Sequence, residues 1–138
     1  MKKRFYLDTS IWMDVYEDRK GYNQEPLGDF ALQLFSRLFS SKSRIIFSDF
    51  LLRELEVNYS LEKIRGMILP FEKLMIKISL SYDQKEEAKI IAKERGVPKG
   101  DSIHAILARD NSAVLVSRDK HFQLLKDICE VVKPEDII

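Results

Sequence analysis

Four acidic residues of this 138-residue chain occupy positions that an ordinary solvated charge would avoid. Asp8 directly follows the apolar run at residues 5–7, and Asp119 comes two residues after the apolar run at residues 113–117. Each run is typical of a buried strand, and open α/β sheets bind ligands at the carboxyl ends of their strands. Because aspartate is also common in turns, either residue alone would carry little weight. Together they predict a ligand site at one edge of a sheet.

Glu54 and Asp101 fall in segments whose apolar spacing predicts helices. At ~100° per residue, Glu54 lies between Phe50 and Leu51 on the apolar face of its helix. A carboxylate there needs a partner, and the nearby sequence offers no basic residue on that face. The alternative is a rim glutamate whose stem packs while its head reaches water. Asp101 precedes another apolar-periodic segment and is expected to be its N-cap, with room for a ligand beside Ala105.

Four carboxylates from four chain segments would repel one another at one sheet edge unless a cation neutralised them. Mg²⁺ and Mn²⁺ are the ions that suit an all-oxygen cluster. Ions held by carboxylates suit phosphoryl chemistry, because they clamp the attacking and leaving oxygens and lower the pKa of an attacking water. These residues therefore favour a nuclease in which a metal-activated water is held by Asp8, Glu54, Asp101 and Asp119.

The apolar pattern also predicts the elements that must position these acids. Strands are expected at residues 5–7, 44–48, 74–78, 113–117 and 130–132. Helices are expected at residues 11–16, 27–39, 50–59, 61–68, 83–95 and 120–126, with another beginning at residue 101. Asp49 is expected to cap the helix that follows it, and Asp83 with Glu86 forms a predicted capping box. The strands are nearly continuous apolar runs, which favours an α/β fold with a parallel sheet covered by helices on both faces.

Composition narrows the class of protein further. The sequence has 23 Lys and Arg against 22 Asp and Glu, a formal charge of +1, so any nucleic-acid site must be local. The length suits one domain, which we place at residues 1–138. No apolar stretch approaches the ~18 residues that a membrane span needs, so no membrane association is expected. The single cysteine, Cys129, allows no internal disulfide, and a cytoplasmic location is expected.

Four segments together resemble the PIN domain family, and are most similar to its VapC-type ribonuclease toxins. The segments, in chain order, are Leu7-Asp8-Thr9-Ser10, Ser48-Asp49-Phe50-Leu51-Leu52-Arg53-Glu54-Leu55, Gly100-Asp101-Ser102-Ile103-His104-Ala105 and Val116-Ser117-Arg118-Asp119-Lys120-His121-Phe122. The resemblance covers essentially the whole chain and implies three α/β/α layers around a mostly parallel five-stranded sheet. It also implies that the metal-binding acids are Asp8, Glu54, Asp101 and Asp119, with Ser10 and Ser117 as supporting hydroxyls.

The resemblance carries a function and partners as well. It implies a ribonuclease, most simply an endoribonuclease, with Mg²⁺ or Mn²⁺ as cofactor and RNA as substrate. It further implies the toxin role in a toxin-antitoxin pair, an antitoxin protein as partner and a two-fold homodimer. Basic residues that could hold substrate phosphates are Arg44, Lys99, Arg118 and Lys120.

One residue departs from the family pattern. Many members carry a further aspartate two residues after the last acid, where this chain has His121. Imidazole is a poor ligand for Mg²⁺, so His121 would shift the preference toward Mn²⁺, contact a phosphate when protonated, or have no role. The last interpretation is favoured, because Asp-x-His-Phe also occurs in such domains.

Other classes of α/β protein are excluded because this chain lacks residues that they require. A haloacid-dehalogenase-like phosphatase requires a second aspartate where this chain has Ser10, and a receiver domain requires an aspartate after its third strand. Rossmann and P-loop nucleotide binders require a glycine-rich first turn, which this chain lacks. The alternative that stays open belongs to another class, a PIN-like scaffold that binds RNA or protein without cutting it.

Several other residues are expected to be structural. His104 is expected to be satisfied within the fold rather than catalytic, and Cys129 to be a small core residue. The aromatic and apolar residues near the N-terminus are also expected in the core, with a partner surface as the alternative, namely Trp12, Met13, Tyr16 and Tyr22.

Overall fold

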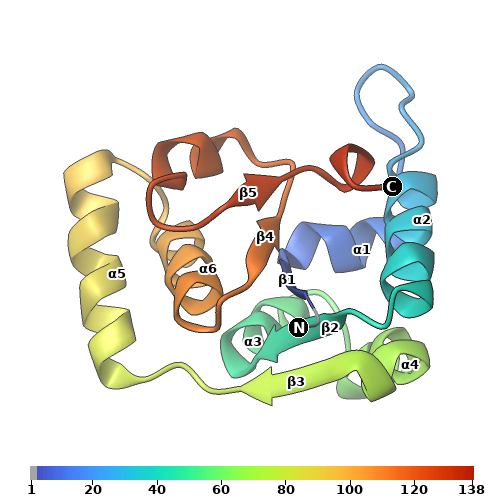
Figure 1. Ribbon diagram of the computed structural model, residues 1–138, viewed down its shortest axis with the longest axis horizontal. Helices are drawn as coiled ribbons and strands as arrows, with labels where there is room; N and C mark the ends of the chain where they lie inside the picture. Colours follow the sequence, from blue (N-terminus) through green and yellow to red (C-terminus); the bar gives the residue numbers. More distant parts are fainter. Residues whose placement is uncertain (1–2) are drawn as a thin grey trace.

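A five-stranded sheet lies at the centre of the computed structural model, which describes residues 3–138 (Figure 1). Every neighbouring pair of strands is parallel, and the strand order is β3-β2-β1-β4-β5. The strands are β1 (Arg4–Leu7), β2 (Arg44–Ser48), β3 (Met75–Ile78), β4 (Val114–Val116) and β5 (Val131–Val132). The predicted central parallel sheet is therefore confirmed.

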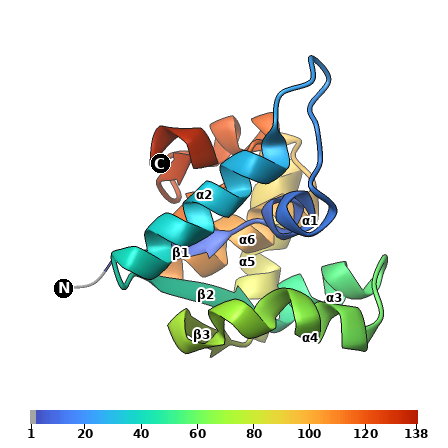
Figure 2. The same ribbon diagram turned by 90° about the vertical axis from the view of Figure 1, so that its right-hand side faces the viewer.

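Helices connect the consecutive strands and cover both faces of the sheet. The connection from β1 to β2 is α1 (Thr9–Glu17) and α2 (Leu27–Ser40), and that from β2 to β3 is α3 (Asp49–Glu56), α4 (Leu61–Ile68) and the 3-10 helix η1 (Leu69–Leu74). Between β3 and β4 lie α5 (Tyr82–Arg95) and α6 (Lys99–Asp110), followed by η2 (Lys120–Leu125) before β5 and η3 (Pro134–Asp136) after it. Figure 2 shows α1 and α2 in front of the sheet and α5 and α6 behind it, which gives the predicted α/β/α layers.

The direction of winding reverses next to β1. The chain adds β2 and β3 on one side of this central strand and β4 and β5 on the other. The register pairs Leu7 with Val116, and the amide of Asp8 donates to the carbonyl of Val116 at 3.0 Å. Ligands of open α/β sheets bind at such a switch point, outside the carboxyl ends of the strands. Asp8 and Ser117, the residues that follow β1 and β4, are therefore held side by side at this point.

The apolar core fixes the helix that follows Asp8. Tyr6 and Leu7 of β1 are fully buried, as expected of a strand covered on both faces. Trp12 of α1 is also fully buried and packs edge-on against Phe35 of α2, with ring centroids 4.9 Å apart. Phe35 in turn stacks on Phe71 at 4.2 Å. This packing anchors α1 to α2 and η1, so the first turn of α1 has a defined place at the sheet edge.

Three predicted helix caps are wrong. Ser81 caps α5, accepting from the Gln84 amide while the Gln84 side chain accepts from the Ser81 amide, so Asp83 and Glu86 do not form the capping box. Ser48 caps α3, and Asp49 instead accepts from the Leu80 amide at 2.9 Å. The N-cap of α6 is Pro98, which puts Asp101 inside the first turn. In each case the helix begins earlier than the nearest aspartate indicated.

Two other structural predictions are wrong in part. Trp12 is in the core, but Tyr16 and Tyr22 are 45% and 98% exposed, because they lie at and beyond the end of α1. Arg44 begins β2 at the opposite edge from Asp8 and donates to the Leu74 and Met75 carbonyls, so it is not placed to contact a phosphate near the acids.

Cys129 is buried as expected. Within residues 3–138, no helix has the length and apolar character needed to cross a membrane.

Candidate active site

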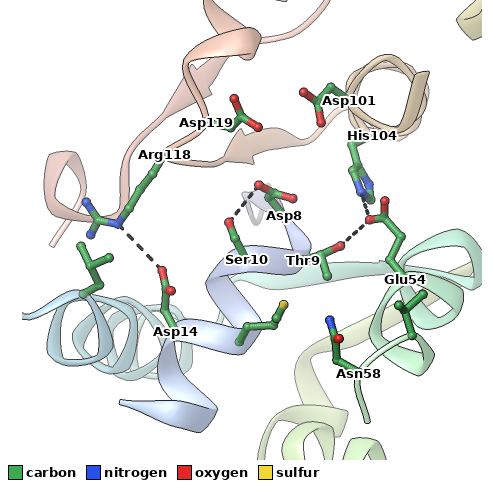
Figure 3. Close-up of a pocket in the computed structure, with 13 residues that line it drawn as sticks. Asp8, Thr9, Ser10, Asp14, Glu54, Asn58, Asp101, His104, Arg118 and Asp119 are labelled. Atoms are coloured by element: carbon green, nitrogen blue, oxygen red, sulfur yellow. Dashed lines mark hydrogen bonds and ion pairs between the residues drawn. The ribbon is translucent and has the colours of Figure 1, made fainter. Parts of the chain in front are cut away.

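A pocket of about 630 Å³ lies at the switch point between β1 and β4 (Figure 3). Side chains from α1, α3, α6 and the segment after β4 line it, and the four predicted acids are among them. The pocket is lined by Asp8, Thr9, Ser10, Met13, Asp14, Leu27, Glu54, Val57, Asn58, Asp101, His104, Arg118 and Asp119. The fold thus brings together acids that are up to 111 positions apart in the sequence, since Asp8 and Asp119 are the outermost pair.

Asp8 is held by serine hydroxyls from two different segments. Its Oδ2 accepts hydrogen bonds from Ser10 Oγ at 3.0 Å and from Ser117 Oγ at 2.7 Å. Ser117 Oγ also accepts from the Asp119 amide at 3.0 Å, which links the two acids through one hydroxyl. Asp8 is buried, and both bonds fall on the same oxygen, so Oδ1 is left for a ligand. Ser10 and Ser117, for which the family resemblance implies a supporting role, therefore both hold Asp8 in place.

Asp101 is the acid least satisfied by the protein itself. Its Oδ2 is buried and has no hydrogen-bond partner among residues 3–138. Burial and, to a smaller extent, the negative charges of Asp119 and Asp8 raise the pKa of Asp101 to about 6, although His104 and His121 oppose this shift. A carboxylate in this state is stabilised by a proton or by a cation. The orphaned oxygen and its acidic neighbours fit a divalent metal ion.

His121 lies beside the same two aspartates. Its Nδ1 is 2.9 Å from Asp119 Oδ1 and 3.3 Å from Asp101 Oδ2. Each of the three residues offers one ligand atom, and these atoms lie within 4.8 Å of one another. Asp119 Oδ1 also accepts from the His121 amide at 2.9 Å, which fixes the first turn of η2. Asp119, rather than Asp101, therefore has a capping role.

Glu54 reaches the pocket from α3 and is well satisfied. Its Oε1 accepts hydrogen bonds from Thr9 Oγ1 and from His104 Nε2, both at 2.6 Å. Burial alone would raise the pKa of Glu54, but the hydrogen bond and charge of His104 and the bond from Thr9 together lower it. Sequence reasoning missed this basic partner, because His104 lies on α6, 50 residues farther along the chain.

A buried chain of hydrogen bonds supports His104 from behind. Its Nδ1 lies 2.7 Å from the Tyr6 hydroxyl, which lies 2.7 Å from Ser48 Oγ. Ser48 Oγ accepts in turn from the Leu51 amide at 3.0 Å. Burial raises the pKa of Tyr6 well above its ordinary value, so its hydroxyl keeps its proton. His104 thus has partners on both ring nitrogens, and the expectation that it is satisfied within the fold is confirmed.

Asp14 and Arg118 also line the pocket, away from Asp101 and Glu54 (Figure 3). Asp14 is buried, and its carboxylate lies 4.0 Å from Arg118 Nε and 4.0 Å from Arg19 Nη1. Burial raises the pKa of Asp14, although the two guanidinium groups oppose the shift. Sequence reasoning missed Asp14, and the available signal was its position three residues after buried Ile11 on an apolar helix face.

Arg118 is the predicted basic residue that lines the pocket. Its Nη1 donates to Glu135 at 2.7 Å, and its guanidinium lies 5.4 Å from the centre of the Phe30 ring. Its Nε and Nη2 are buried and have no hydrogen-bond partner. Lys120 is exposed at the start of η2, and Lys99 lines a separate hollow with other basic residues. The three predicted basic residues are therefore not equivalent.

Comparison with known proteins gives the family. Residues 5–128 match the family described as PIN domain. The chain therefore belongs to the PIN domain family. A search of curated proteins finds no match to the sequence.

Solved structures of similar fold come from several bacteria. The crystal structure of VapBC2 from Rickettsia felis bound to a DNA fragment from their promoter has a TM-score of 0.66 at 16% identity, covering 94% of this chain and 98% of that one. A toxin-antitoxin complex from Klebsiella pneumoniae gives 0.63 at 21% identity, with 94% and 97% covered. FitAcB from Neisseria gonorrhoeae gives 0.62 at 14% identity, with 95% and 98% covered. At these identities the likeness shows the shared fold.

Proposed function

We propose that this chain is a divalent-metal-dependent ribonuclease that cuts RNA internally. The observation that carries the proposal is the group of three aspartates at the switch point, Asp8, Asp101 and Asp119, one of which has a buried oxygen without a partner. Such a group is suited to a cation that carboxylates can hold, such as Mg²⁺ or Mn²⁺. Membership of the PIN domain family, which consists generally of nucleases, supports the same class of activity.

Each acid has a defined task in this proposal. A bound divalent ion neutralises the carboxylates, lowers the pKa of an attacking water and stabilises charge on the phosphate. Asp8 is oriented by Ser10 and Ser117 and presents Oδ1, while Asp101 and Asp119 present oxygens from the far side of the pocket. Glu54 stays ionised at neutral pH because its pKa is lowered, and the bonds from Thr9 and His104 both fall on Oε1.

We assign the basic residues to different phosphates of the RNA backbone. Arg118 lines the pocket and has two guanidinium nitrogens without a hydrogen-bond partner among residues 3–138, so we assign it to the phosphate that is cut. Lys120, next to Asp119, and Lys99, which shares its hollow with Arg53 and Lys85, are assigned to flanking phosphates. These assignments fit a nearly neutral chain, in which attraction to RNA must come from local positive charge.

The test is cleavage of single-stranded RNA by the purified chain in Mg²⁺, in Mn²⁺ and in EDTA. Cleavage is expected with either ion and not in EDTA, and a circular RNA should also be cut because internal cleavage needs no free end. Asp8→Asn, which keeps the size of the side chain, is the matched inactive variant. Unchanged activity in EDTA would overturn the metal mechanism. RNA binding with no cleavage under any of these conditions would instead favour the non-cleaving scaffold.

We also propose that the chain is the toxin of a toxin-antitoxin pair and forms a homodimer. The toxin role is supported by structural likeness to VapBC2 from Rickettsia felis and to the toxin-antitoxin complex from Klebsiella pneumoniae, and the homodimer is an expectation from the family resemblance. Induced expression in a bacterial host should stop growth, and the Asp119→Asn variant should not. Light scattering should give twice the mass of one chain, and a monomer at high concentration would count against the dimer alone.

A further inference from the structure

His121 places a ring nitrogen beside Asp101 and Asp119, where it could act as a metal ligand. His121 Nδ1 lies 2.9 Å from Asp119 Oδ1 and 3.3 Å from Asp101 Oδ2. In the part of the chain that the structure describes, this nitrogen and the Asp101 oxygen are both buried and make no hydrogen bond of acceptable geometry. Three potential ligand atoms thus surround one point, and two of them have no other bond. The sequence favoured no role for His121. The geometry gives it a place beside the metal-binding acids.

His104, the other histidine of the chain, differs from His121 in its hydrogen bonds and in its exposure. Both of its ring nitrogens are engaged, Nε2 with Glu54 and Nδ1 with Tyr6. Its side chain is 2% exposed, whereas that of His121 is 41% exposed. Of the two histidines, His121 is therefore the one whose ring nitrogen beside Asp101 and Asp119 has no hydrogen-bond partner among residues 3–138.

We propose that His121 Nδ1 is a direct ligand of the ion held by Asp101 and Asp119, so that the site prefers Mn²⁺ to Mg²⁺. Imidazole coordinates first-row transition ions and is a poor ligand for Mg²⁺, which takes oxygen ligands. Where an aspartate would add a negative charge and an oxygen, His121 adds a neutral nitrogen. The inference rests on the proposed metal-dependent function, but its test uses the metal ion without RNA.

Pulsed electron paramagnetic resonance of Mn²⁺ bound to the full chain tests this ligand directly. The bound ion should show coupling to an imidazole ¹⁴N nucleus, and the coupling should change to that of ¹⁵N when histidine is ¹⁵N-labelled. His121→Asn should remove the coupling. Gln123→Ala, an exposed change on the same 3-10 helix, should leave it intact.

Competition between the two ions tests the preference. Mg²⁺ is titrated against bound Mn²⁺, and the ratio of the two affinities is measured for the parent and for His121→Asp. Because changes around metal ligands alter affinity by about 10–100-fold, the aspartate variant should lower the Mn²⁺-to-Mg²⁺ affinity ratio about tenfold or more. Bound Mn²⁺ without nitrogen coupling, coupling that persists in His121→Asn, or an unchanged ratio in His121→Asp would each overturn the inference.

These outcomes are separable from those of the cleavage assay. Nitrogen coupling in a protein that cuts no RNA would leave His121 as a ligand and remove the nuclease proposal. RNA cleavage in Mn²⁺ without nitrogen coupling would keep the nuclease and remove His121 from the metal site.

Discussion

Glu54 and Asp101 line the same pocket, yet the protein treats their carboxylates in opposite ways. Glu54 Oε1 accepts two hydrogen bonds, and its pKa is lowered. Asp101 Oδ2 is buried without a partner, and its pKa is raised to about 6. Glu54 is therefore satisfied without a ligand, while the half of the pocket that contains Asp101 holds a carboxylate oxygen that the protein leaves without a partner.

This difference separates two tasks that the sequence alone assigned to four equivalent acids. Groups whose surroundings push their pKa values apart can perform different roles in one reaction. The Glu54 half keeps an ionised carboxylate in a fixed orientation through Thr9 and His104. The half that contains Asp8, Asp101 and Asp119 gains most from a bound cation. The following predictions test whether the two halves are as distinct as their geometry indicates.

The largest effect is expected from Asp8→Asn, which weakens the metal-binding half. Because even indirect partners of metal ligands are worth about 10–100-fold, loss of this carboxylate should reduce RNA cleavage by more than about 100-fold. Single-turnover rates in saturating Mn²⁺ measure the effect, with the exposed Asp83→Asn on α5 as the control. The stabilisation of the folded chain by Mn²⁺ should fall as well. Cleavage within a few-fold of the parent would show that Asp8 has no essential role.

The next effect concerns Asp101 in the metal-free protein. Its folded-state pKa of about 6 lies above the ordinary 3.8, so the folded state binds the proton more tightly than the unfolded state. The stabilising contribution of this proton is present below about pH 4 and is lost as the pH rises through about 6. Asp101→Asn should therefore be more stable than the parent at pH 7, by roughly 2 kcal/mol after allowance for partial solvation, and similar at pH 4.

Urea unfolding in EDTA at the two pH values measures this difference. Asp119→Asn is the less clean comparison, because Asp119 Oδ1 also accepts from the His121 amide at the start of η2. Asparagine can still accept this bond, so only part of the cap's contribution of about 1 kcal/mol would be lost, and that loss would mask part of the gain. An Asp101→Asn variant no more stable than the parent at pH 7 would mean that burial and the neighbouring acids do not destabilise the charged Asp101 as described.

The sequence was sufficient to find the strand ends and the acids that follow them. Continuous apolar runs marked β1 and β4, and parallel strands bring their carboxyl ends to one edge, so Asp8 and Asp119 could be predicted to meet. The helix starts were less certain, because serine and aspartate compete for the same capping role. Ser48 and Ser81 took that role through side-chain bonds that no periodic pattern encodes.

The partners of the buried charges could not be predicted from local sequence. Glu54 is paired with His104 through the packing of α3 against α6, and Asp14 lies between guanidinium groups from residues far apart in the chain. His121 was recognised as a departure from the family pattern, but only its distances to Asp101 and Asp119 gave it a role to test. Such contacts depend on tertiary geometry rather than on spacing along one element.

A smaller effect of opposite sign is expected for Glu54→Gln. The pKa of Glu54 is lowered from its ordinary 4.5, so its stabilising contribution is present above that value and is lost as the pH falls. Because the amide keeps an acceptor but loses the charge, the variant should be less stable than the parent by about 1 kcal/mol at pH 7. The deficit should shrink toward pH 4. A variant more stable than the parent at pH 7 would place Glu54 in the same class as Asp101.

The smallest effect is expected from substitutions in the first turn of α1, which contributes one hydrogen bond to each half of the pocket. Thr9 donates to Glu54 and Ser10 donates to Asp8, although the two residues are adjacent at the start of α1. Thr9→Val keeps the shape of the side chain and removes one donor, which should raise the pKa of Glu54 and cost about 0.5–1 kcal/mol at pH 7. Ser10→Ala is the matched control, because it removes a bond to the other half of the pocket and should leave the pKa of Glu54 unchanged. Carbon NMR titration of the labelled carboxylates follows each acid separately. If Thr9→Val shifted the pKa of Asp101 as much as that of Glu54, the two halves would be one coupled group, and the division of tasks between them would be wrong.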